Sequence, residues 1–188
     1  MRENNTMSGP NPKTTLLIAS GAHALAGQTY GGKPYGQHLQ EVAHILRSVG
    51  FSNEDGQRAA FLHDLLEDTE WTSKMLMEVG FSEEVVAAVQ FCTDAEGENR
   101  KARKAATYKR VREALDSNSF GAAMGVVVKW ADRLANLRAC ARDNNKGLMK
   151  MYRKEAATFL TAYMPPKDMV LGEVFGKMLA EYDRLLGR

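Results

Sequence analysis

The sequence predicts an all-α protein with a single helical domain. Three observations support this fold class: apolar residues recur at helical spacing, strand signals are nearly absent, and 188 residues fit one domain with a sizeable core. We expect about eight to nine helices in a domain at residues 14–188, preceded by a flexible segment at residues 1–13. The predicted helices cover residues 14–26, 37–49, 53–66, 73–79, 83–92, 100–116, 120–142, 147–163 and 166–186.

Breakers and apolar stripes define the first three helices. Residues 27–36 are rich in glycine and are predicted to form a loop. Residues 37–49 carry apolar side chains at i, i+3, i+4 and i+7, which form one stripe on a helix. Gly50 ends this helix, and Ser52 is suited to cap the next one.

The remaining helices follow from caps and composition. Thr72 and Ser82 are suited to cap the two short helices that follow. Residues 93–99 are polar and predict a loop before a basic helix. The three valines at residues 126–128 are β-branched, but they lie inside the longer apolar pattern of residues 120–142, which favours a helix. Pro166 stands where a last helix could begin.

The composition indicates an ordinary globular protein. Apolar residues make up 44% of the chain and charged residues 26%, which excludes disordered, collagen-like and coiled-coil chains. No run of about 18 apolar residues is present, so we expect no membrane-spanning helix and no membrane partner. The polar start shows no secretory signal. Cys92 and Cys140 lie in helical patterns, which fits reduced thiols and a cytoplasmic protein.

The formal net charge of +2 hides two blocks of opposite sign. Residues 54–98 hold twelve Asp and Glu against two basic residues, a net charge of −10, and residues 100–112 hold seven Lys and Arg with no acid. The blocks fit two solvated helix faces. They also fit a cation site beside a surface for an anionic substrate.

The segment FLHDLLEDTE at residues 61–70 is the first candidate site. Glu67 and Asp68 follow Asp64 at i+3 and i+4, so on a helix they share one face with it, next to His63. Carboxylates that close repel unless a cation such as a divalent metal neutralises them. The alternative is an exposed acidic helix end, which the apolar neighbours of this segment make less favourable.

The segment VVVKWADRLANLRAC at residues 126–140 is the second candidate site. Asp132 lies in a strongly apolar helix, with Asn136 on the same face at i+4. A carboxylate there is costly to bury unless it is paired or binds a metal. The alternative is an ion pair with Arg133, with Lys129 or with the basic helix.

His38, at the start of a helix, could complete a mixed ligand set. Together with His63, Asp64 and Asp132 it would provide two imidazoles and two carboxylates. Such a set suits Mn²⁺, Fe, Co²⁺ or Zn²⁺ better than Mg²⁺ or Ca²⁺, which prefer oxygen ligands alone. Four protein ligands would leave room on the metal for water and a substrate oxygen. The other two histidines, His23 and His44, are interpreted as packing or surface residues.

These motifs resemble the hydrolase domain of RelA/SpoT homologues, within the HD superfamily of metal-dependent phosphohydrolases. The resemblance covers about residues 15–165 and implies an HD-type helical bundle. Because the chain has no room for synthetase and regulatory domains, it is most similar to the single-domain small alarmone hydrolases, a group that includes a metazoan SpoT homologue. The matching segments are GQ, GKPY, His38, VAHIL, HDLLEDT and KWADRLANLR.

The resemblance implies an activity and a set of roles. The family hydrolyses the alarmones ppGpp and pppGpp with Mn²⁺, which releases pyrophosphate and GDP or GTP. Glu67 and Asp68 match the pair that orients or deprotonates the attacking water. Asn136 matches a residue near the ribose and the 3′-phosphates, and Arg133 matches a phosphate contact or a partner of Asp132. The positions that match the metal ligands are His38, His63, Asp64 and Asp132.

The substrate contacts are predicted less directly. Phosphates would meet the basic segment, with Arg103, Lys104 and Lys109 as candidates, and also Lys33 and Arg133.

The family often has an arginine shortly after GQ that stacks on the base, and here residues 29–31 occupy that stretch with one residue fewer. Tyr30 could stack instead, which leaves guanine specificity open. An HD phosphohydrolase for adenine alarmones such as ppApp, for NADPH or for another nucleotide is the alternative. A nucleotide-binding scaffold with a decayed site is a further alternative, disfavoured because all matched ligands are present.

Nucleic-acid binding through residues 100–112 is disfavoured, because only Tyr108 interleaves with the basic residues. A homo-oligomer is possible through the apolar last helix.

Overall fold

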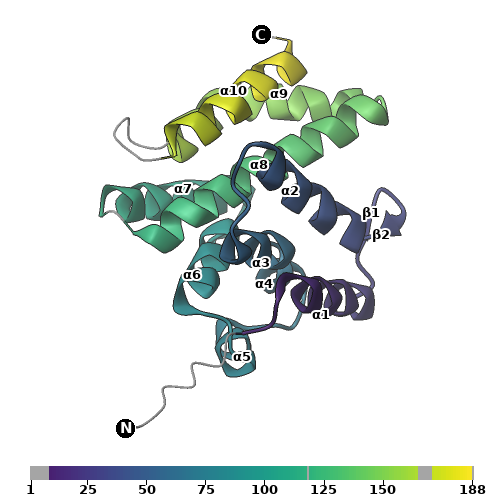
Figure 1. Ribbon diagram of the computed structural model, residues 1–188. Coiled ribbons are helices and arrows are strands. Elements are labelled where there is room, and N and C mark those ends of the chain that lie inside the picture. The colour runs from purple at the N-terminus through teal and green to yellow at the C-terminus, as the bar shows by residue number, and fades with distance from the viewer. Residues whose placement is uncertain (1–8, 118, 165–170, 188) are drawn as a thin grey trace, which may run out of the picture.

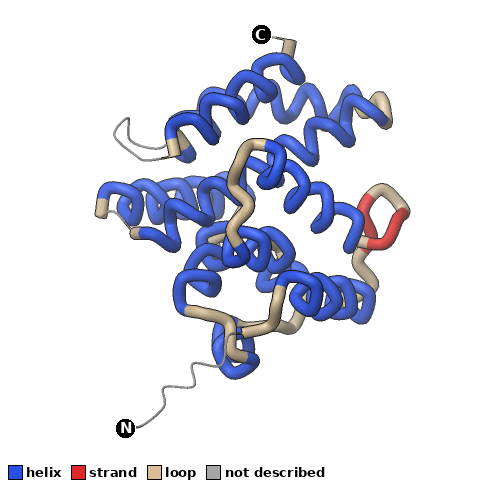
Figure 2. Tube along the Cα trace, in the orientation of Figure 1, coloured by secondary structure: helices blue, strands red, loops and turns tan. Residues whose placement is uncertain are grey.

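The computed structural model describes residues 9–117, 119–164 and 171–187, and these form a bundle of α-helices with one short β-hairpin (Figures 1 and 2). This confirms the all-α prediction. The elements are α1 (Pro12–Leu25), β1 (Thr29–Tyr30), β2 (Lys33–Pro34), α2 (Gly36–Ser48), α3 (Glu54–Leu62), α4 (Leu65–Asp68), α5 (Ser73–Val79), α6 (Glu83–Cys92), α7 (Arg100–Asp116), α8 (Phe120–Arg142), α9 (Lys146–Tyr163) and α10 (Gly172–Leu186).

Helix α8 is the centre of the bundle. It crosses the middle of the molecule, with α9 and α10 on one side and α2, α3 and α6 on the other (Figure 1). Trp130 in α8 is fully buried among the rings of Phe159, Phe175 and Tyr182, and its indole N–H donates to the carbonyl of Tyr163 at 2.9 Å. This aromatic layer fixes the position of α8 and therefore of Asp132, two residues later.

Two glycines let α8 approach α6 closely. A Cβ atom on Gly125 would lie 2.8 Å from the carbonyl oxygen of Ala88, and one on Gly121 would lie 2.6 Å from the Cβ of Ala87. Both distances are shorter than van der Waals contact, so the two helices could not pack this way with alanine at either position.

We therefore expect Gly125→Ala to lower the free energy of unfolding by roughly 1–2 kcal/mol, because overpacking a core costs about 1–3 kcal/mol and alanine returns up to about 1 kcal/mol of helix propensity. Gly176→Ala is the matched control, since Gly176 is exposed on the surface of α10 and nothing lies within 4 Å of its Cβ position. It should stabilise slightly. Urea unfolding measures both, and a shift of the two variants in the same direction would contradict the packing argument.

The start of α1 differs from the prediction. The helix begins at Pro12, because Asn11 caps it by accepting a hydrogen bond from the backbone N–H of Thr14, and proline suits the first helical turn. Arg58 donates to the carbonyl of Pro10 at 2.8 Å, which ties this end of the chain to α3. Residues 1–8 of the predicted flexible segment, and the predicted helix start at Pro166, lie outside the described residues.

The helix predicted at residues 53–66 is interrupted. Asn53 caps α3 in place of Ser52, and α3 ends at Leu62 before a turn at His63 and Asp64. The backbone N–H of Asp68 bonds to the carbonyl of Asp64 at 3.0 Å in the first turn of α4, so these two residues keep the predicted i+4 relation. The turn places His63 and Asp64 at the junction of two helices.

The loop predicted at residues 27–36 contains a β-hairpin. Tyr30 pairs with Lys33 across a two-residue turn. Gly31 and Gly32 have φ values of 58° and 75°, which this tight hairpin turn requires and which residues with a Cβ rarely adopt. The hairpin leads directly into α2.

Both cysteines are buried free thiols, as the sequence predicts. None of the helices in the described ranges combines the length and apolar character that crossing a membrane requires.

Candidate metal centre and active site

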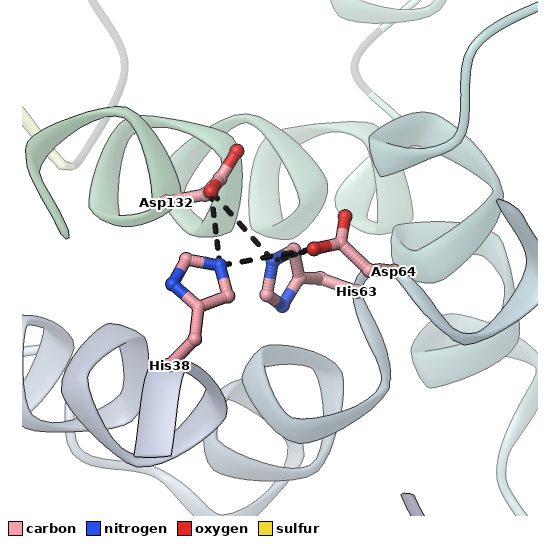
Figure 3. A group of neighbouring side chains, drawn as sticks. All are labelled: His38, His63, Asp64 and Asp132. Carbon is pink, nitrogen blue, oxygen red and sulfur yellow. Dashed lines mark ion pairs between the residues drawn. The ribbon is translucent and has the colours of Figure 1, made fainter. Parts of the chain in front are cut away.

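The four predicted metal ligands converge in one place. Their ligand atoms all lie within 4.8 Å of one another, on three separate parts of the fold: α2, the α3–α4 junction and α8 (Figure 3). We call this set the ligand cluster, and it consists of His38, His63, Asp64 and Asp132.

Nitrogen and oxygen atoms face each other across the cluster. The Nε2 atom of His63 lies 2.8 Å from Oδ2 of Asp64 and 3.7 Å from Oδ1 of Asp132. The Nε2 atom of His38 lies 3.3 Å from Oδ1 of Asp132 and 3.7 Å from Oδ2 of Asp64. Each imidazole therefore faces both carboxylates (Figure 3).

The tautomer of His63 is suited to metal binding. Its Nδ1 atom lies 2.8 Å from the carbonyl oxygen of Ala60, which can only accept, so Nδ1 carries the proton. The buried Nε2 atom faces the Asp64 carboxylate at 2.8 Å. A histidine held in this way presents its Nε2 lone pair to a metal, and the mixed N/O set fits a divalent transition metal.

The electrostatics of the cluster favour a cation. Burial alone would lower the pKa of His63, but the Asp64 and Asp132 carboxylates raise it to about 10. Burial also opposes ionisation of the two aspartates, yet the pKa values of both lie below the usual range. His63 stabilises the carboxylate of Asp64. Lys129 is the main group that stabilises the carboxylate of Asp132. Without metal, a proton on His63 fills the place that a divalent ion would take.

Lys129 is a site residue for which the sequence suggested no role beyond an ion pair. Its Nζ atom lies 3.1 Å from Oδ2 of Asp132, so the ion pair offered as an alternative exists beside the ligand cluster. Burial disfavours the charged amine, but Asp132 and Asp64 raise the pKa of Lys129 well above its usual value. Lys129 neutralises only one of the two buried carboxylates.

Glu67 and Asp68, predicted as the catalytic pair, lie on α4 one turn from Asp64. They line a cavity of about 610 Å³ together with Trp71 and Ala22. Partial burial and the nearby Asp64 raise the pKa of both carboxyl groups. The backbone N–H of Asp94 approaches Oε2 of Glu67 at 3.4 Å. The pair therefore lines an open cavity one helical turn from Asp64.

Asn136 and Tyr30 are in contact with the ligand cluster. The amide of Asn136 donates to Oδ1 of Asp132 at 2.6 Å and accepts from the hydroxyl of Tyr30 at 2.7 Å. The ring of Tyr30 stacks on His38 with centroids 4.3 Å apart. One face of the ring that was expected to stack on a base is therefore already covered.

Comparison with known proteins agrees with this geometry. The family model for the HD domain matches residues 16–160. The chain belongs to the HD-domain family.

Two curated relatives of this HD-domain protein are named as 3′-pyrophosphohydrolases. It is 34% identical over 110 residues to the probable guanosine-3′,5′-bis(diphosphate) 3′-pyrophosphohydrolase of Synechocystis, covering 57% of this chain and 14% of that one. It is 34% identical over 117 residues to the guanosine-3′,5′-bis(diphosphate) 3′-pyrophosphohydrolase MESH1 of Danio rerio, covering 62% of this chain and 61% of that one. The match spans less than two thirds of either relative.

Solved structures share the fold. The HD-domain protein matches the structure described as a metazoan ortholog of SpoT that hydrolyzes ppGpp with a TM-score of 0.66 and 21% identity, covering 91% of this chain and 94% of that one. It matches lmo0812 from Listeria monocytogenes with a TM-score of 0.54 and 26% identity, covering 80% and 99%.

The basic residues of α7 are mostly paired in this HD-domain protein. Lys104 lies 2.9 Å from Asp94, whose backbone contacts Glu67, so Lys104 reaches the rim of the site. Lys109 pairs with Glu113 on the exposed face of α7. The side chain of Arg103 is exposed to solvent on α7 and does not belong to the ligand cluster.

Arg133 and Lys33 lie in different places relative to the ligand cluster. Arg133 points away from Asp132: it pairs with Glu155 at 3.4 Å and packs against the rings of Tyr152 and Phe159. Lys33 lines a cavity of about 270 Å³ that also touches His38. The structure thus brings Tyr30, Asn136 and Lys33 near the cluster, and it directs Arg133 toward α9.

Tyr35 and His23 are HD-site neighbours to which the sequence assigned no role. The hydroxyl of Tyr35 donates to Oδ2 of Asp64 at 2.6 Å, and its ring stacks on buried His23 with centroids 4.1 Å apart. Burial lowers the pKa of His23 to about 4, so this imidazole is neutral. Tyr35 belongs to the GKPY segment, but only its tertiary contact reveals its partner. His44 is exposed, in line with its predicted surface role.

Proposed function

We propose that this HD-domain protein hydrolyses the 3′-diphosphate of (p)ppGpp-type alarmones and releases pyrophosphate and GDP or GTP, with Mn²⁺ in the ligand cluster. The observation that carries the proposal is the convergence of two imidazoles and two aspartates beside the Glu67–Asp68 pair. The 3′-pyrophosphohydrolase names of two relatives support the same reaction. Other divalent transition metals are alternatives to Mn²⁺.

The proposed chemistry divides between the metal and the catalytic pair. When bound, a divalent metal supplies Lewis-acid chemistry, polarising a phosphate oxygen and making water a better nucleophile. Glu67 and Asp68 orient the attacking water in line with the leaving group and accept its proton. Their raised pKa values bring them closer to neutrality, where a general base is most effective.

The remaining charge of the substrate requires further cations. Lys104 at the rim and Lys33 in the cavity beside His38 are the candidates on opposite sides of the cluster. Lys104 would exchange its contact with Asp94 for a phosphate oxygen. Arg103, Lys109 and Arg133 remain predictions as phosphate contacts.

The pH dependence of the rate should report the catalytic pair. Because a general base acts only when ionised, and partial burial and Asp64 raise both pKa values, kcat should fall with decreasing pH at values above the ordinary carboxylate range of about 4. The pH profile of kcat at saturating Mn²⁺ measures this limb. A profile that stays flat down to the ordinary carboxylate pKa would contradict the assignment.

A second substrate class deserves a direct comparison. The stretch that contains Tyr30 lacks the arginine that often stacks on the base in the family, and the ring and hydroxyl of Tyr30 contact His38 and Asn136. This favours testing adenine alarmones, NADPH and nucleoside monophosphates beside ppGpp. Incubation with Mn²⁺ followed by anion-exchange chromatography separates the products. Pyrophosphate from ppGpp supports the proposal, and orthophosphate from monophosphates alone would refute it.

We also propose a cytoplasmic location for the protein. Buried free thiols fit the reducing cytoplasm. A homo-oligomer remains a prediction, which light scattering of the purified chain would test.

A further inference from the structure

We propose that the β1–β2 hairpin is a clamp in which Tyr35 and Tyr30 are positioning residues for the metal ligands. The two tyrosines stand at opposite ends of the hairpin, and each reaches one ligand carboxylate, Tyr35 directly and Tyr30 through Asn136. The inference rests on the metal site of the proposed function. It assigns to this hairpin a role in metal affinity that the ligands alone do not provide.

Tyr35 fixes the first carboxylate. Its hydroxyl donates at 2.6 Å to Oδ2 of Asp64, the same oxygen that faces Nε2 of His63 at 2.8 Å. A carboxylate oxygen has two lone pairs. When the phenol occupies one, the other is directed toward the centre of the cluster. A phenol is protonated near neutral pH, so Tyr35 is a donor to this carboxylate.

Tyr30 fixes the second carboxylate through an amide. Because the Asp132 carboxylate can only accept, it holds the NH₂ group of Asn136 toward its Oδ1 atom at 2.6 Å, and the amide oxygen of Asn136 then accepts from the Tyr30 hydroxyl at 2.7 Å. Without the phenol, the Asn136 oxygen would lose this donor and the side chain would be held only at its NH₂ end. Tyr30 therefore anchors the amide that supports the ligand.

The tyrosine rings support two histidines. The Tyr30 ring stacks on the ligand His38 at 4.3 Å with planes 17° apart. The Tyr35 ring stacks on His23 at 4.1 Å with planes 15° apart, and it meets His38 edge-on at 5.5 Å. Within the described part of the chain, neither ring nitrogen of buried His23 has a hydrogen-bond partner, so His23 acts as a flat support for Tyr35.

The hairpin makes the two contacts interdependent. The positive φ values of Gly31 and Gly32 set a tight turn that fixes Tyr30 opposite Lys33. Tyr35 follows β2, and its carbonyl accepts the backbone N–H of His38 at 2.9 Å in the first turn of α2. A single short element therefore places both phenols and the first ligand.

Metal titration of phenylalanine variants tests the clamp. Each variant of the full chain is stripped of metal, and Mn²⁺ is titrated by calorimetry. Tyr35→Phe should weaken Mn²⁺ binding by about 10- to 100-fold, as expected for loss of a hydrogen bond to a metal ligand. Tyr30→Phe, which acts through Asn136, should weaken it by a smaller factor. The visible spectrum of bound Co²⁺ should shift in Tyr35→Phe, which a purely structural role would not cause.

Tyr163→Phe is the matched control. It removes a buried phenol oxygen that lies in the aromatic core and has no hydrogen-bond partner among the described residues. Its Mn²⁺ affinity should equal that of the unaltered protein, and its metal-free unfolding midpoint should be unchanged or slightly raised.

Several outcomes would decide against the clamp. Unchanged Mn²⁺ affinity in both Tyr35→Phe and Tyr30→Phe would overturn it, and absence of Mn²⁺ binding by the unaltered protein would overturn the metal site with it. If the variants weaken Mn²⁺ as expected but ppGpp is not hydrolysed, the clamp stands and the proposed substrate fails.

Discussion

Replacing Asp64 by asparagine is expected to lower pyrophosphate release from ppGpp by roughly 10³-fold or more and to weaken Mn²⁺ binding. The change removes the charge of a ligand whose Oδ2 atom faces both histidines. It also leaves the buried His63 without the carboxylate charge that faces its Nε2 atom at 2.8 Å. Initial rates at saturating substrate and Mn²⁺ calorimetry measure the two effects.

Asp116→Asn provides the control for this experiment. Asp116 is an exposed carboxylate at the end of α7 that pairs with Arg112 at 3.2 Å, and such surface pairs contribute little. Its rate and Mn²⁺ affinity should match those of the unaltered chain. An Asp64→Asn variant that retains the full rate would refute the ligand assignment.

Replacing Glu67 by glutamine should separate catalysis from metal binding. A positioned general base contributes about 10²–10⁴-fold to a rate, so kcat should fall by a factor in that range. Glu67 does not belong to the ligand cluster, so Mn²⁺ affinity should be nearly retained. Single-turnover kinetics and calorimetry together measure this separation, and Asp68→Asn shows how the two carboxylates share the role.

Glu78→Gln is the matched control for the catalytic pair, because Glu78 is exposed on α5 and pairs only with Lys74. It should leave both kcat and Mn²⁺ affinity unchanged. Unaltered kcat in both Glu67→Gln and Asp68→Asn would exclude the pair as the base.

The sequence predicted the helices well where local chemistry decides them. Apolar stripes and cap residues such as Thr72 and Ser82 depend on neighbours a few positions away, and both residues cap helices as expected. The break at His63 and Asp64 escaped prediction because no glycine or proline marks it and apolar residues stand on both sides of it. The hairpin escaped because its strands are two residues long, too short for an alternating pattern.

The site residues, like the helices, were predictable only where the local sequence determines them. Residue types and the resemblance were enough to name the four residues that meet in the ligand cluster. The roles of Tyr35 and Lys129 depend on which side chain lies opposite in the fold, which spacing does not reveal. Arg133 shows the converse. It is adjacent to Asp132 in sequence, but consecutive helical residues face different directions, so it reaches Glu155 on α9 instead.

The most direct test of the account is a titration of Mn²⁺ into the metal-free protein in the presence of ppGpp, with released pyrophosphate measured at each step. We predict no release without metal, and a rate that rises and saturates as one Mn²⁺ binds per chain. The products should be pyrophosphate and GDP in equal amounts. Unchanged ppGpp at every Mn²⁺ concentration, or full turnover by the metal-free protein, would contradict it.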